Sequence, residues 1–384
     1  MTRTVQKRFV KSPRAEVRIA AARRFLEGLG KRRPFLVVAP SRHAADRLVH
    51  ETAEAEGAGG GLLGAYRFGL LVLAQRLARP ELAARGLKPL TPAARLAAVV
   101  RVIHRARRRG ELGRFREASE GPGLAVRLAS TFDELRLAEL GGERVAAVEE
   151  SLGVLYADYL ASLAEIGLAD RAETFAAAVR GIEGGAAPPV GLPLLLLDIP
   201  LAGRATRRFA RTLAEAAPQV FLTLPEGDQA TETAARTLGA VPLPAEESLA
   251  DELPGDAVTS AQRQLFVTRR PHPARERRGL SVIAAPGTAA EAIEHARAFL
   301  AEATEGVPFD RMAVLLSEPA SQAPSFQEAF ERARVPAFFE AGARRPHPAG
   351  RAFLVLLDCA REGLSASRFA EYLSLGETPA SPTR

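Results

Sequence analysis

The sequence is poor in the residues that build several common kinds of site. Its 384 residues include one cysteine, Cys359, and no tryptophan, and only 6% are aromatic. A single cysteine excludes an internal disulfide, a cysteine-based zinc site and an iron–sulfur cluster. An apolar run of about 18 residues is also lacking, and residues 1–11 have no signal-peptide apolar stretch. We therefore expect no membrane segment and a cytoplasmic location.

Apolar and charged residues are present in ordinary proportions. Apolar residues make up 47% of the chain and charged residues 25%, proportions typical of a globular protein. A disordered chain has a lower apolar content than this. At about 150 residues per domain, the length predicts two or three domains.

Positive charge is concentrated near the N-terminus. Residues 1–50 hold thirteen lysines and arginines against three acidic residues, a net charge of +10, whereas the whole chain carries +7, so the remainder carries −3. Such clusters suit a polyanion, because neutralising phosphates releases counterions. The alternative interpretation is a set of solvated helix faces. A second basic group comprises Arg101, Arg105, Arg107, Arg108, Arg109, Arg114 and Arg116.

Short apolar runs alternate with helical patterns in residues 1–89 and 186–250. This alternation predicts an α/β unit with a parallel sheet. Residues 90–185 have almost only helical patterns and are interpreted as a helical insertion in that unit. Residues 251–278 form a connector, and 279–384 begin a second α/β unit. The expected strands are 4–10, 35–39, 194–197 and 219–224 in the first unit, and 280–284 and 312–316 in the second.

The turn after the first predicted strand departs from a nucleotide-binding loop. Such a loop needs glycines whose amides surround phosphates, but this turn contains Lys11, Ser12, Pro13 and Arg14. Asp198 ends an apolar strand, as a magnesium-holding aspartate would, or it caps a loop. Lys11, Ser12, Arg14 and Asp198 are therefore candidates for a degenerate nucleotide site. We expect no cofactor unless that site functions, in which case ATP and magnesium would bind.

Signatures of catalysis are lacking. The chain has no Gly-x-Ser-x-Gly sequence and no Pro-Asp…Asp/Glu-x-Lys nuclease pattern, and Cys359 lies on an apolar helical pattern. The sequence therefore predicts neither a catalytic residue nor a metal site. The six histidines, which lack metal-ligand spacing, are His43, His50, His104, His272, His295 and His347.

The succession of several stretches resembles superfamily-one helicases of the UvrD type, specifically the AddB-like subunit of bacterial helicase–nucleases. The stretches are 35–48, 64–68, 121–136, 194–200 and 279–349, and they cover most of the chain in the family's order. The resemblance implies two RecA-like parallel-sheet units of the P-loop NTPase fold, with the helical insertion in the first. It also implies a single-stranded DNA site made by Pro40, Ser41, Arg42, His43, Tyr66, Arg67 and Phe68.

The sequence also departs from that family. The phosphate loop is missing, Ile199 follows Asp198 where a glutamate is expected, and Ser317 stands where active motors have arginine. The family's C-terminal nuclease domain, of the PD-(D/E)XK type, and its cysteine-held cluster are not found. We therefore expect this chain to be the N-terminal portion of a longer protein or a truncated product.

The leading functional hypothesis is an inactivated helicase-like module. It would bind single-stranded DNA and act as a scaffold in double-strand-break repair by recombination, with an AddA-like helicase–nuclease subunit as a possible partner. Arg42 and Arg67 would contact phosphates, and Tyr66 or Phe68 would either stack on bases or pack in the core. The alternatives are an ATP-dependent DNA helicase or exonuclease subunit, and an RNA- or partner-binding protein that reuses the fold.

Overall fold

A computed structural model describes residues 6–30, 32–55, 61–121, 123–185, 188–243, 257–264, 279–339 and 348–375. The chain divides into two compact units, Met1–Gly279 and Leu280–Arg384. Of the predicted connector 251–278, only α11 (Ala257–Gln264) is described; the rest lies outside the described residues, as do 340–347 of the stretch 279–349.

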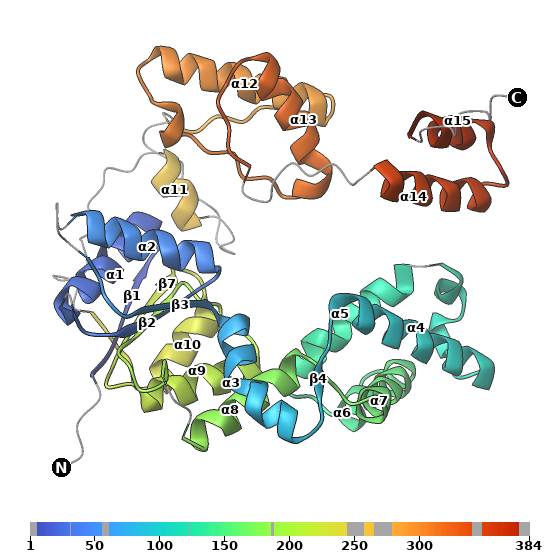
Figure 1. The fold of residues 1–384 in the computed structure, drawn as a ribbon, viewed down its shortest axis with the longest axis horizontal. Helices are drawn as coiled ribbons and strands as arrows, with labels where there is room; N and C mark the ends of the chain where they lie inside the picture. Colours follow the sequence, from blue (N-terminus) through green and yellow to red (C-terminus); the bar gives the residue numbers. More distant parts are fainter. Residues whose placement is uncertain are drawn as a thin grey trace, which may run out of the picture. The chain divides into compact units, whose positions relative to one another are not determined.

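The first unit is built around a six-stranded sheet in which every pair of neighbours is parallel (Figure 1). Its order is β3-β2-β6-β7-β1-β8. Strands β2 and β6 contain only apolar residues and are buried at every residue, as parallel strands covered on both faces must be. The expected α/β fold class is confirmed. The strands are β1 (Gln6–Ser12), β2 (Phe35–Ala39), β3 (Ala65–Gly69), β6 (Leu194–Leu197), β7 (Gln219–Pro225) and β8 (Val241–Pro242).

Two helix layers cover this sheet. Successive strand side chains point to opposite faces, so Val10 and Val37 pack under α1 and α2, whereas Phe9 and Leu36 join the core on the other face. Figure 1 shows α1 and α2 on the side of the sheet away from α8 and α9. The first layer is α1 (Ala15–Leu29) and α2 (Arg42–Ala55), and the second is α3 (Leu70–Ala84), α8 (Arg171–Glu183), α9 (Arg204–Ala216) and α10 (Gln229–Thr237).

A helical insertion with its own apolar core leaves the first unit after α3. Phe132 packs on Tyr156 and Tyr159, with ring centroids 5.4 and 5.0 Å away. The parallel pair β4 (Lys88–Pro89) and β5 (Leu168–Ala169) joins the two ends of the insertion. Its helices are α4 (Pro92–Arg109), η1 (Gly113–Phe115), η2 (Glu117–Glu120), α5 (Gly123–Leu137), α6 (Gly142–Ala146) and α7 (Glu150–Glu165).

Helix α8 differs from its sequence-based placement. The helical pattern grouped it with the insertion, which was predicted to run to residue 185, but α8 packs on α3 and α9 in the layer under the sheet. Phe175 of α8 contacts Phe209 of α9 with ring centroids 5.5 Å apart. A Cβ at Gly181 would lie 2.8 Å from the Leu77 carbonyl oxygen, so α3 and α8 approach closely because this residue is glycine. Helical periodicity identifies a helix but not its packing partner.

The two buried tyrosines of the insertion predict instability at high pH. Burial raises the pKa of Tyr156 and of Tyr159, whereas phenols in an unfolded chain ionise near pH 10. The neutral phenols favour the folded state fully below about pH 10, and this contribution is lost as the pH rises further. In an alkaline titration, phenolate absorbance from these two residues should appear together with the loss of helical circular dichroism. Ionisation of both tyrosines while the helical circular dichroism is unchanged would contradict this prediction. The Tyr156→Phe/Tyr159→Phe variant identifies which part of the phenolate absorbance comes from these two residues.

The second unit is helical in its described residues. Phe326 and Phe330 of α13 pack on α12 around Ala292 and Ala296. The expected strands 280–284 and 312–316 are not strands, and the described part of this unit contains no sheet. A parallel strand needs neighbours that take its backbone hydrogen bonds and cover its side chains, but Val282 is 92% and Leu315 93% exposed. The elements are α12 (Thr288–Thr304), η3 (Phe309–Arg311), α13 (Pro319–Arg332), α14 (Pro348–Arg361) and α15 (Ala366–Leu375).

Candidate functional site

The turn between β2 and α2 has the geometry that its residues predict. Ser41 is the N-cap of α2, and its hydroxyl oxygen accepts a hydrogen bond from the Ala44 amide at 3.1 Å. Pro40, Arg42 and His43 are exposed on this turn, as is Ser41. The turn lies at the carboxyl edge of the sheet, where open parallel sheets generally bind ligands.

Two arginines of the predicted DNA site meet at one carboxylate. Arg67 on β3 places its Nη1 3.2 Å from Oδ1 of Asp46, and Arg42 places its Nε 3.6 Å from Oδ2 of the same residue. Arg67 comes close to α2 because β3 pairs in register with β2, opposite Val37. We call Arg42, Asp46 and Arg67 the Asp46 cluster. It carries a net charge of +1, and its two arginines are 74% and 38% exposed, so their remaining N–H donors are accessible to an anion.

The predicted aromatic residues lie on the other face of the same strand. Tyr66 and Phe68 are half-buried against the core that contains α3 and α8. The Arg76 guanidinium carbon lies 5.6 Å from the centre of the Phe68 ring. Strand alternation separates these rings from Arg67, because side chains one residue apart point to opposite faces. The structure therefore brings together Arg42 and Arg67, but not the aromatics with them.

The lysine and arginine of the candidate nucleotide site are held by other acidic groups. Lys11 Nζ lies 2.9 Å from Glu232 on α10, and Arg14 Nη2 lies 2.8 Å from Glu16. The hydrogen bond from Lys11, together with that from Arg236, holds the pKa of Glu232 below its usual range. The Ser12 hydroxyl oxygen accepts a hydrogen bond from the Arg14 amide at 3.1 Å.

Asp198 is held by a buried arginine that sequence reasoning missed. Arg18 of α1 is 7% exposed, and its Nε donates to both carboxylate oxygens of Asp198 at 3.0 and 3.1 Å. The Arg18 Nη1 also donates to the Ser12 carbonyl oxygen at 2.6 Å. Thr223 on β7 completes the arrangement, since its hydroxyl donates to Asp198 Oδ1 at 2.7 Å and accepts from the Asp198 amide at 3.0 Å.

This arrangement does not fit a magnesium–nucleotide complex. Both oxygens of Asp198 already accept from Arg18, and the positive charge of this guanidinium would repel a metal ion. The turn of Ser12, Pro13 and Arg14 provides no glycine for the close approach of backbone amides to phosphates. Ser12 and Asp198 are brought to one place, through Arg18, but Lys11 and Arg14 face other partners.

The sequence contained a pattern that indicates a buried position for Arg18. Arg18, Ala22 and Leu26 are spaced four residues apart and therefore share one helix face. All three are buried. A charged residue on an apolar helix face requires a buried partner, and Asp198 at the end of an apolar strand was the available carboxylate. No feature of the sequence pointed to Thr223.

No protein-family model matches the chain, and no curated protein matches its sequence. In the described part of the chain, no group of three or more His, Cys, Asp and Glu side chains is arranged to hold a metal ion. None of the helices described is long and apolar enough to cross a bilayer.

Proposed function

We propose that this chain is a helicase-like binding module that holds single-stranded DNA at the carboxyl edge of its parallel sheet. The observation that carries the proposal is the Asp46 cluster, in which residues from a helix and a neighbouring strand present two guanidinium groups at one exposed place. Arginine binds phosphate oxygens through its planar set of donors. The +10 charge of residues 1–50 would add long-range attraction for a polyanion.

The resemblance to AddB-like subunits extends this proposal to a cellular role. We infer that the module acts in the cytoplasm as a scaffold in recombination repair, with an AddA-like helicase–nuclease subunit as its partner. The pairing of Arg18 with Asp198 favours this binding role over ATP-driven unwinding, because it occupies the carboxylate that a motor would use for magnesium.

Binding of a fluorescent oligonucleotide, measured by anisotropy at several salt concentrations, tests the DNA site. Arg42→Ala and Arg67→Ala should each weaken binding about tenfold at low salt, the value of one hydrogen bond to a charged group. Each should also reduce the slope of log K against log salt by about 0.7, the effect of one lost phosphate contact on a single strand. Asp46→Asn should strengthen binding, because a carboxylate that repels phosphate is removed.

Arg144→Ala is the matched control, since Arg144 is an exposed arginine on α6 of the insertion. It should leave affinity nearly unchanged. Equal losses in all three arginine variants would mean that DNA does not bind at the Asp46 cluster, and undetectable binding at low salt would overturn the proposal. A structured RNA hairpin that binds as tightly as the single strand would favour the alternative of an RNA-binding protein.

A further inference from the structure

Helix α3 carries two arginines that form no ion pair in the described part of the chain. Arg76 and Arg79 lie three residues apart, so they share one side of the helix, and both are exposed. The one acidic residue of α3, Glu81, is held by Arg180 of α8 at 2.9 Å. This side of α3 therefore presents two positive charges to an anion.

The Arg76 guanidinium lies over an aromatic ring of β3. Its central carbon is 5.6 Å from the centre of the Phe68 ring, and Phe68 packs against the core below. Because Arg76 is exposed, the side of its guanidinium that faces away from the ring is accessible. Nucleic-acid bases stack on guanidinium planes as they do on aromatic rings. We call this pair the Arg76 stack, and Val72, one turn earlier on α3 and 55% exposed, adds apolar surface on the same side of the helix.

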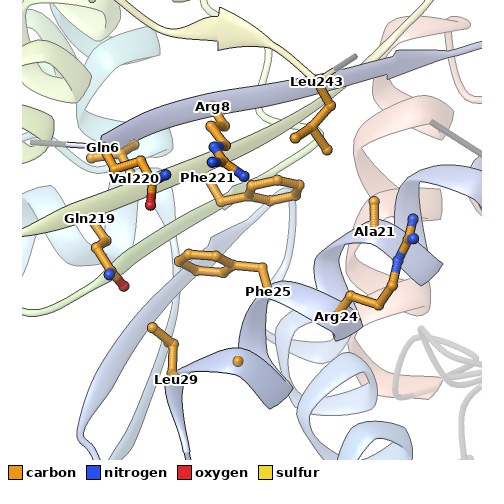
Figure 2. Close-up of a pocket in the computed structure, with 11 residues that line it drawn as sticks. Gln6, Arg8, Ala21, Arg24, Phe25, Leu29, Gln219, Val220, Phe221 and Leu243 are labelled. Atoms are coloured by element: carbon orange, nitrogen blue, oxygen red, sulfur yellow. The ribbon is translucent and has the colours of Figure 1, made fainter. Parts of the chain in front are cut away.

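A second aromatic pair of the first unit is arranged differently. Phe25 and Phe221 line a hollow of about 340 Å³ beside α1, and their ring centroids are 5.1 Å apart with an angle of 12° between the rings. Figure 2 shows the two side chains reaching toward each other from helix and sheet. Each ring therefore covers the face that the other would offer to a base. The Arg76 stack has no such second ring and can be extended by a base.

Only the edge strand separates the Arg76 stack from the Asp46 cluster. Strand β3 is the last strand of the sheet, and in the described residues no strand pairs with its outer side. Arg67 and Phe68 are neighbours on β3 and point to opposite faces. One strand occupies about 4.8 Å of a sheet. A flexible chain that passes around this edge can therefore contact both places.

We propose that a single strand of nucleic acid passes around the edge of β3, with phosphates at the Asp46 cluster and a base on the Arg76 stack. Arg79 would hold a phosphate next to that base. Duplex DNA does not fit this path, because it is stiff over about 150 bp and its base faces are already stacked on each other. The inference rests on the proposed function, to which it adds a base-stacking contact and a path for the strand.

A single-stranded oligonucleotide of about eight nucleotides, in which one base at a time is replaced by the fluorescent base 2-aminopurine, tests the stack. Stacking quenches this base, so one position should lose most of its fluorescence on binding to the 384-residue chain. Arg76→Gln should restore that fluorescence and weaken binding about tenfold, the value of one stacked base. Arg76→Lys keeps the charge but not the planar group, so it should restore the fluorescence and leave the salt dependence unchanged.

Two further variants separate the phosphate contact from the stack. Arg79→Gln should reduce the slope of log K against log salt by about 0.7, the effect of one lost phosphate contact, and leave the quenching unchanged. Arg144→Gln is the matched control, since Arg144 is an exposed arginine of α6 away from α3, and it should change neither quantity. Circular dichroism confirms that each variant is folded.

Equal quenching in the wild type and in Arg76→Gln would overturn the proposal, as would equal losses of affinity for the single strand and for a duplex of the same sequence. Quenching that persists in Arg76→Gln but is lost in Phe25→Leu would assign the base to the hollow of Figure 2 and would also overturn it.

The path around β3 and the proposed function can fail separately. Weaker binding in Arg42→Ala and Arg67→Ala, with no change in Arg76→Gln and Arg79→Gln, would contradict the path and leave the DNA site at the Asp46 cluster. The reverse pattern would contradict that DNA site, and with it the path.

Discussion

Replacing Arg18 with alanine should lower the free energy of unfolding of the first unit by about 3 kcal/mol. The substitution leaves the Asp198 carboxylate without its counter-ion, and breaking a buried ion pair from one side costs about 3–5 kcal/mol. We expect the lower end because the Asp198 side chain is 23% exposed and keeps some contact with water. Urea unfolding followed by circular dichroism measures the change.

Two further variants distinguish the cost of leaving a buried charge unpaired from the cost of lost side-chain packing. Arg18→Met combined with Asp198→Asn removes both charges. Asparagine tolerates the positive φ of 48° at residue 198. The free energy of unfolding of this double variant should therefore be closer to that of the wild type than the value for Arg18→Ala alone. Arg211→Ala breaks an exposed pair with Glu215 and should leave the free energy of unfolding nearly unchanged. An Arg18→Ala variant as mild as Arg211→Ala would show that the Arg18–Asp198 pair contributes little to stability.

Asp170→Ala should destabilise the chain by about 4 kcal/mol, because Asp170 has two roles at the base of the insertion. It is the N-cap of α8, accepting from the Glu173 amide at 2.8 Å, and it accepts from Arg136 Nε on α5 at 2.5 Å. The residue is only 4% exposed. Loss of a cap costs about 1 kcal/mol, and loss of a buried counter-ion costs about 3 kcal/mol or more.

Asp228→Ala is the matched control for the capping role. Asp228 caps α10 by accepting from the Thr231 amide at 2.9 Å, and among the described residues its side chain accepts from Thr231 and from no arginine. It should cost about 1 kcal/mol. Asp170→Asn, which keeps a capping oxygen but loses the charge, should fall between the two alanine variants. Urea unfolding measures all three, and equal costs for Asp170→Ala and Asp228→Ala would contradict a structural role for the Arg136–Asp170 pair.

Limited proteolysis gives a second measure of the same contact. Asp170 links α5 of the insertion with α8 of the layer under the sheet, so its loss should loosen the junction between them. Cleavage near residues 138–149, between α5 and α7, should become faster in Asp170→Ala than in Asp228→Ala.

Properties encoded within a single segment could be predicted from the sequence. The apolar run at 35–39 was enough to predict β2, and the turn that follows is local as well, because the Ser41 hydroxyl caps α2 through the Ala44 amide. The start of α4 depends on near neighbours too, since the Thr91 hydroxyl oxygen accepts from the Ala94 amide at 3.2 Å and Pro92 is the first helical residue. These elements follow from hydrogen bonds and periodicity among residues close in the chain, so their bounds do not depend on the rest of the fold.

Contacts between distant segments could not be predicted from local patterns. Arg18 and Asp198 are 180 residues apart, and they meet because β1 and β6 lie on either side of β7 and all three end at one edge of the sheet. The same sheet separates Arg67 from Tyr66 and Phe68, although the three are consecutive, and brings Arg67 to Asp46 instead. Local sequence patterns were sufficient to predict the α/β class and most of the elements of the first unit. Which charges pair and which face of the sheet each aromatic residue joins depended on strand order, because these properties belong to contacts that no local pattern encodes.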